Sequence, residues 1–155
     1  SRGLGDVYKR QVLVYSPIGE QIEQKSEVVE INIMSKAYDF LKECGAFFVL
    51  SINGDYPAGR PFGAVMEVGD DLYLSTNDMN QAHKQIRANE HIQIVAKKAE
   101  SREWIRITGV ATECDDKTLK DRMLEECPIL QQRFGAVGME HFILLKVKVE
   151  NVEIK

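Results

Sequence analysis

Short hydrophobic runs separated by turn residues dominate the chain from Ala46 onward. Runs of this length predict β-strands, and turn signals such as Gly54-Asp55 and Gly69-Asp70-Asp71 predict hairpin connections between them. The last run, His141–Lys155, alternates between apolar residues and lysines over part of its length. We expect five or six strands, drawn from the segments 46–53, 62–68, 72–76, 91–97, 102–113 and 141–155.

A helix is expected immediately before the first of these strands. The hydroxyl of Ser35 can cap its start, and Gly45 can end it. Its apolar face consists of four residues at helical spacing, which are Ala37, Phe40, Leu41 and Cys44.

Two further segments have helical character. The first runs from about Met79 to Ala88, with Asn77 or Asp78 as its cap. The second opens at Asp115-Asp116 and is stopped or kinked by Pro128, because proline disrupts a helix interior.

Residues 1–33 lack the hydrophobic pattern of the rest. The stretch Asp6–Gln11 matches the in-frame translation of a transposase end sequence used in sequencing libraries. We therefore expect Met34 to be the natural start, and residues 1–33 to be a non-native extension made of an adapter scar and translated upstream sequence. The alternative is a short natural extension with a strand around Val12–Tyr15.

The predicted elements define one domain, residues 34–155, of mainly β structure with α-helices (α+β). Several strands follow one another at hairpin spacing. This spacing favours a closed or partly closed antiparallel barrel with two or three flanking helices over a parallel doubly wound sheet.

Composition and charge exclude several classes. The 155 residues carry a formal net charge of −4, which gives no attraction to nucleic acid or anionic lipid. No apolar run is long enough to cross a bilayer. The three cysteines have no metal-binding or disulfide spacing, which suits a reducing cytoplasm and argues against a zinc site.

A candidate anion site follows from residues at strand ends. Arg60 precedes Pro61 and is therefore held extended, so that its guanidinium can reach a phosphate. Ser75, Thr76 and Asn77 stand where a strand passes into a helix, and hydroxyls and free N–H groups at such a place bind anions. Considered singly, Arg60 could instead be a solvated arginine beside a turn, and Ser75, Thr76 and Asn77 an ordinary helix cap.

Other candidates are weaker on spacing alone. Gln81 and Lys84 lie on the following helix, where a solvated face is the alternative for the lysine. Trp104 lies within a strand and can stack on a ring, cover a dimer seam or pack internally. His91 and His141 have no partner at metal spacing and are interpreted as structural. The sequence contains no nucleophile elbow, phosphate loop, dinucleotide fingerprint or H-E-x-x-H motif.

In order and spacing, these segments together resemble the pyridoxamine 5′-phosphate oxidase-like family of FMN-binding split barrels, and most closely its short bacterial members. The resemblance covers nearly all of residues 34–155. It rests on the helix ending in Cys44-Gly45, the strand Phe47–Ile52, Arg60-Pro61-Phe62-Gly63, Leu72–Asn77, Gln85-Ile86 with Asn89, and Trp104–Gly109.

The resemblance implies an antiparallel split β-barrel and a homodimer with two FMN molecules at the subunit interface. Arg60 matches the family's phosphate-binding arginine, and Ser75 and Thr76 match the strand end that lines the cofactor. Gln81 matches the first residue of a basic pair on the phosphate, and Trp104 falls where a polar side chain approaches the flavin. The expected cofactor-binding residues are Arg60, Pro61, Phe62, Ser75, Thr76, Asn77, Gln81, Lys84 and Trp104.

The sequence also departs from the family. The second residue of the basic pair is Ala82, so the phosphate charge must be met by Arg60, Lys84 or His83.

We do not expect this protein to oxidise pyridoxamine 5′-phosphate, the substrate after which the family is named. The lysine, tyrosine and arginine that bind its phosphate in true oxidases correspond to Val65, Met123 and Cys127, and the C-terminal tryptophan and arginine are absent. A dianionic phosphate is costly to desolvate without charged partners.

We therefore expect a cytoplasmic, homodimeric FMN-binding flavoprotein, an oxidoreductase that passes electrons from a small-molecule donor to a small-molecule acceptor. No side chain stands out as a catalytic acid or base, and no metal, nucleic acid or membrane is expected as a partner. The alternatives are a non-catalytic flavin-binding module, or a related split barrel that binds deazaflavin or haem.

Overall fold

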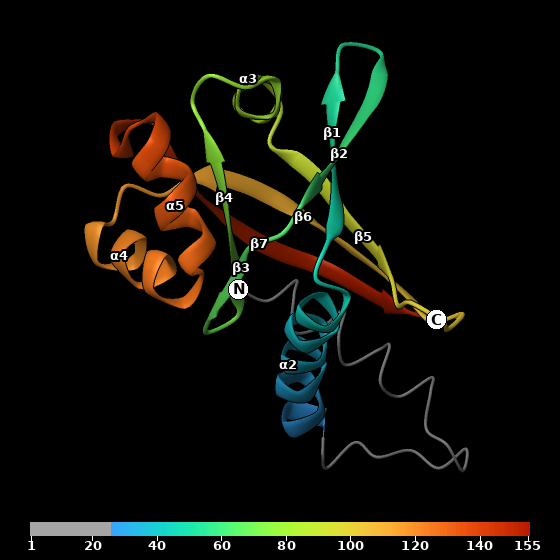
Figure 1. Ribbon diagram of the computed structural model, residues 1–155. Helices are drawn as coiled ribbons and strands as arrows, with labels where there is room; N and C mark the ends of the chain where they lie inside the picture. The colour runs from blue at the N-terminus through green and yellow to red at the C-terminus, as the bar shows by residue number, and fades with distance from the viewer. Residues whose placement is uncertain (1–25) are drawn as a thin grey trace.

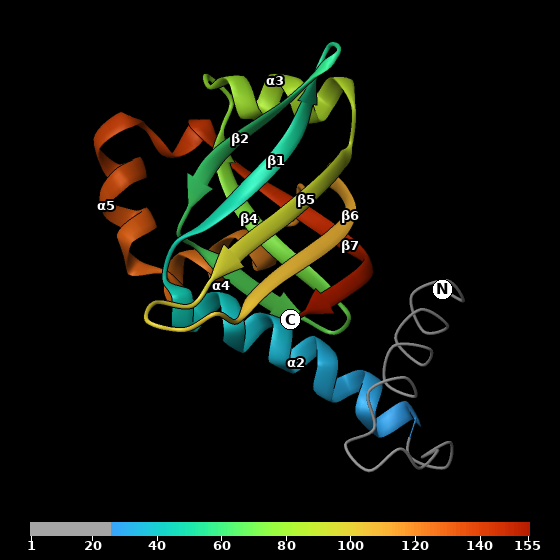
Figure 2. The same cartoon turned by 90° about the vertical axis from the view of Figure 1, so that its right-hand side faces the viewer.

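Seven antiparallel strands form one curled sheet in the computed structural model, which describes residues 26–155. The strand considered for 12–15 lies outside the described residues. The order across the sheet is β2-β1-β5-β6-β7-β4-β3, so β2 and β3 form its edges. Figures 1 and 2 show the sheet wrapped into a barrel. The strands are β1 (Phe47–Asn53), β2 (Tyr56–Phe62), β3 (Val65–Val68), β4 (Asp71–Asn77), β5 (His91–Lys97), β6 (Trp104–Glu113) and β7 (Phe142–Ile154).

Alternation along the strands builds the barrel core. In β6, for example, Ile105 and Ile107 are fully buried while Trp104 and Arg106 on the opposite face are half-buried. Gly109 marks a register shift between β6 and β7, where a Cβ would collide with the carbonyl oxygen of Lys148. A glycine is therefore required at this bulge.

Four α-helices flank the barrel in the described part of the chain: α2 (Ser26–Cys44), α3 (Gln81–Ala88), α4 (Lys117–Glu126) and α5 (Pro128–Val137). The 3₁₀ turn η2 (Met139–His141) leads into β7. In Figures 1 and 2, α2 lies across one end of the barrel and α3 across the other, while α4 and α5 lie outside it beside β4. No described helix is long and apolar enough to cross a membrane.

A second hydrophobic cluster holds α4 and α5 against the sheet. Leu130 and Phe134 of α5 are buried, and the ring of Phe134 lies 5.0 Å from that of Phe142 on β7. Met123 of α4 and Met66 of β3 are buried in the same cluster. This packing fixes α5 at the rim of the barrel.

The fold class expected from the sequence, an α+β antiparallel split barrel, is confirmed. Two helix starts were wrong. Helix α2 begins at Ser26, so Ser35 lies inside it, although Gly45 ends it with a φ of 76° as expected. The cap of α3 is Asn80 rather than Asn77 or Asp78, because the Asn80 side chain accepts a hydrogen bond from the His83 amide.

One helix and the first half of one strand were missed. Pro128 does not merely end a helix but begins α5, since proline is tolerated in the first helical turn. The described part of the chain therefore has four α-helices, where two or three were expected. Arg60, Pro61 and Phe62 lie on the edge strand β2 as expected, but residues 56–59 of that strand were not among the expected segments, because glycine and two prolines interrupt its sequence; an edge strand tolerates them. The strand expected over 62–68 is divided, since β2 ends at Phe62 and β3 begins at Val65. Whether residues 1–33 are native stays a prediction.

Candidate functional site

A pocket of about 170 Å³ opens at the rim of the barrel, between the edge strand β2, the end of β4 and the helix α5. We call it the arginine pocket, because two arginines and no acidic residue stand among its described lining residues. Its lining is Arg60, Pro61, Phe62, Gly63, Ala64, Ser75, Thr76, Asn77, Asn80, Arg133 and Phe134.

Arg60 is half-buried and is held by neutral partners only. One guanidinium nitrogen donates to the hydroxyl of Ser51 at 2.7 Å and to the carbonyl of Val49 at 3.3 Å, and another donates to Gln85 Oε1 at 2.5 Å. The Ser51 hydroxyl donates to the same oxygen of Gln85 at 2.7 Å. Partial burial lowers the pKa of Arg60, because water no longer fully solvates its charge. The guanidinium is thus oriented but not neutralised.

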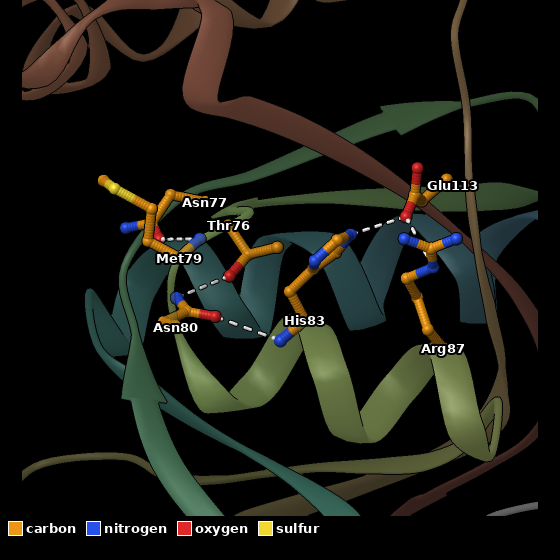
Figure 3. A network of polar contacts seen from close by, with 7 residues as sticks. All are labelled: Thr76, Asn77, Met79, Asn80, His83, Arg87 and Glu113. Carbon is orange, nitrogen blue, oxygen red and sulfur yellow. Dashed lines mark hydrogen bonds and ion pairs between the residues drawn. The ribbon is translucent and has the colours of Figure 1, made fainter.

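The end of β4 supplies the polar wall of the pocket. Ser75 and Thr76 are buried, and the Thr76 hydroxyl accepts a hydrogen bond from the side-chain Nδ2 of Asn80 at 2.8 Å. Asn80 in turn caps α3 through His83 N at 3.0 Å, and Asn77 accepts from Met79 N at 2.9 Å (Figure 3). These bonds fix the turn between β4 and α3, so the rim of the pocket is preformed.

Six of the nine residues expected from the sequence therefore line one pocket, and three do not. Gln81 and Lys84 are exposed on α3 and are absent from the lining. Trp104 lies at the start of β6, paired with Lys97 of β5, and the Arg106 guanidinium lies 5.1 Å from the centre of its ring. It occupies the outward face of the sheet.

Sequence reasoning missed Asn80 and Arg133. Asn80 was overlooked because the cap was expected at Asn77 or Asp78, which precede it. Arg133 lies on α5, and a helix that was expected to stop at Pro128 gave no reason to place it near the barrel rim.

The three residues that the family resemblance matched to the substrate-phosphate ligands of true oxidases are part of the core. Val65, Met123 and Cys127 are 2%, 0% and 6% exposed, and none of them lines the arginine pocket. The Cys127 thiol points to the Val65 carbonyl at 3.9 Å, and its burial raises its pKa. Met123 and Cys127 belong to the cluster that packs α4 and α5 on the sheet, whereas Val65 belongs to the barrel core.

A second pocket, of about 240 Å³, lies at the other end of α3 and is lined by Arg87, Glu90 and Glu113 among others. We call it the glutamate pocket. Beside it, the buried His83 imidazole lies 2.5 Å from Glu113 Oε1, and Arg87 Nε lies 3.6 Å from the same oxygen (Figure 3). No group of three metal-ligating side chains occurs among the described residues.

The curled antiparallel sheet with its rim pocket defines a small split-barrel protein. The model of the family described as pyridoxamine 5′-phosphate oxidase matches residues 33–155. The chain belongs to this family, in agreement with the resemblance seen in the sequence.

Solved structures share this fold. A NimC/NimA family protein from Clostridium acetobutylicum is 35% identical, covers 74% of this chain and 81% of its own, and has a TM-score of 0.67. An FAD-binding protein from Mesorhizobium loti is 12% identical, with 77% and 91% coverage and a TM-score of 0.58. The heme storage protein HutZ from Vibrio cholerae is 12% identical, with 79% and 94% coverage and a TM-score of 0.60. The last two show the fold alone. None of the curated proteins compared with the chain matches it.

Proposed function

We propose that the protein is a cytoplasmic, homodimeric FMN-binding flavoprotein that acts as an oxidoreductase on a small molecule. The observation that carries the proposal is the arginine pocket: a fixed guanidinium without a carboxylate partner among the described residues, beside two buried hydroxyls. Such a pocket suits a ligand with an anionic group and several polar atoms.

The lining residues fit the parts of FMN. Arg60 would bind the phosphate, the hydroxyls of Ser75 and Thr76 would meet polar atoms of the cofactor, and Pro61 and Phe62 offer apolar contacts to the ring system. When bound, the flavin supplies hydride and electron transfer, and the chain supplies binding and orientation.

Haem fits the pocket less well. Haem iron is usually held by histidine, cysteine, methionine or tyrosine, and none of these occurs among the lining residues. His83 is buried against Glu113, outside the pocket. The described lining residues therefore favour a flavin over haem.

A second copy of the chain would complete the site. The pocket, at about 170 Å³, is smaller than the roughly 300–1,000 Å³ of typical ligand sites. Beside it, the outward face of β1 exposes Phe48 and Ile52 by 53% and 40%, and Phe48 is paired with Pro61 of the pocket wall. An exposed apolar face next to an incomplete site favours a subunit interface there. Trp104 lies on the same outward side of the sheet and would approach the partner.

A charged substitution on the exposed face of β1 tests the proposed subunit interface. Phe48→Asp should shift the protein from dimer to monomer in analytical ultracentrifugation and weaken FMN binding, because a buried unpaired carboxylate opposes association. Ile129→Asp, at a 55% exposed position on α5, is the matched control and should remain dimeric. Two dimeric variants with unchanged FMN affinity would exclude the β1 face as the interface.

We further propose that pyridoxamine 5′-phosphate is not the substrate, because the positions of its phosphate ligands are filled by the buried Val65, Met123 and Cys127. Efficient oxidation of that compound by the purified protein would contradict this.

The absorption spectrum of the purified protein tests the function. Flavin bands that bleach on addition of a reduced nicotinamide and recover with an acceptor support the oxidoreductase. Stable flavin bands without turnover support the non-catalytic module instead. A Soret band, a deazaflavin spectrum or a protein that takes up no FMN would overturn the cofactor assignment.

A further inference from the structure

Arg133 is the second cation of the arginine pocket, and it comes from a helix outside the barrel. Lys84 is exposed on α3 and His83 is buried against Glu113, so neither of these expected sources of charge lines the pocket. Arg60 and Arg133 therefore supply all the cationic charge among its described lining residues. In a chain of net charge −4, two arginines without an acidic neighbour in one small pocket favour an anionic ligand.

The two arginines differ in how they are held. Arg60 is bound to Ser51 and Gln85. Arg133 is exposed, and it makes no hydrogen bond or ion pair with another described residue, so its five N–H donors are available to a ligand.

The position of Arg133 is nevertheless fixed at its backbone. Its neighbour Phe134 is 2% exposed, also lines the pocket and packs on Phe142. The buried Phe134 ring therefore holds the backbone of Arg133 at the pocket mouth. The exposed Arg133 side chain can still reorient toward a ligand.

We propose that Arg133 binds the phosphate of FMN together with Arg60, one arginine from α5 and one from β2. This inference rests on the proposed flavin function. Arg133 would supply the charge that Ala82, 4% exposed on α3, cannot. An arginine is suited to this role because its planar fork can donate two parallel hydrogen bonds to phosphate oxygens.

The test compares FMN with riboflavin, which carries the same ring without the phosphate. Both are titrated into the flavin-free full chain, as wild type and as Arg133→Ala, Arg133→Lys and Arg102→Ala. Arg102 is an exposed arginine outside the pocket, so its removal changes net charge equally.

The Arg133→Ala variant should bind FMN about tenfold to a hundredfold more weakly, the effect of one or more charge-assisted bonds, and should bind riboflavin within about twofold of wild type. Arg133→Lys should recover part of the loss, and Arg102→Ala should show none. Unchanged FMN affinity, or equal losses for FMN and riboflavin, would overturn the assignment.

Failure of the flavin function can be told apart from failure of this inference. If the wild type binds neither flavin, inorganic phosphate is titrated while the arginine Nε–Hε resonances are followed by NMR. Shifts at both Arg60 and Arg133 would support a phosphate site without a flavin. No shift at Arg133 would overturn the inference as well.

Discussion

The two pockets at the ends of α3 differ more in charge than in size. The arginine pocket, about 170 Å³, has two arginines and no acid in its described lining, whereas the glutamate pocket, about 240 Å³, combines Arg87 with Glu90 and Glu113. Arg87 already has a carboxylate 3.6 Å away, so an anion would have to compete with it. The glutamate pocket, although larger, is therefore the weaker candidate for an anion-binding site. Its arginine is already paired with a carboxylate, whereas the arginines of the other pocket are not.

The largest expected effect separates the two pockets by their arginines. Arg60→Ala should weaken FMN binding by about 1.5–3 kcal/mol for each charge-assisted hydrogen bond lost. Arg87→Ala, in the glutamate pocket, should leave the FMN affinity unchanged. Isothermal titration calorimetry on both variants measures the difference. Similar losses for the two arginines, or none for Arg60, would break the comparison.

The glutamate pocket is expected to matter for stability instead. Glu113→Ala should lower the free energy of unfolding by about 1–3 kcal/mol, because the buried His83 imidazole loses its hydrogen-bond partner. Urea denaturation measures this, with Glu90→Ala as the control, since the exposed Glu90 side chain has no partner among the described residues. Equal stability of the two variants would show that the His83 contact contributes nothing.

The smallest effect concerns the orientation of Arg60. Gln85→Ala removes the acceptor shared by Arg60 and Ser51, and should weaken FMN binding by about 0.5–1.5 kcal/mol while Arg60 remains in place. Gln93→Ala, a half-buried glutamine that donates to Thr108 on the outer face of the barrel, is the matched control. A Gln85 variant with full affinity would show that the guanidinium does not need this support.

The sequence predicted the barrel because its signal is local. Short apolar runs bounded by turn residues are recognised from neighbouring residues alone, and the expected segments 91–97 and 102–113 form β5 and β6, the latter from Trp104. The first half of strand β2 and helix α5 were missed for an equally local reason. Their prolines are read as breakers, and only the edge position of β2 and the first-turn position of Pro128 make them acceptable.

The part of the candidate site that lies at strand ends was predictable from the sequence. Arg60 to Phe62 and Ser75 to Asn77 lie at the ends of strands and meet at the barrel rim as expected. Arg133 could not be placed, because its position depends on the packing of Phe134 against Phe142. Lys84 was a candidate because it follows Ser75, Thr76 and Asn77 closely in the sequence. It lies on the solvent-exposed face of α3 and does not line the pocket. Tertiary packing decides which cations reach a pocket.

Native mass spectrometry of the purified full chain, supplied with FMN, tests the central claim most directly. The proposal predicts a dimer carrying two FMN molecules, released as intact FMN on denaturation. A monomer without bound flavin, or a dimer that carries haem or no cofactor, would contradict it.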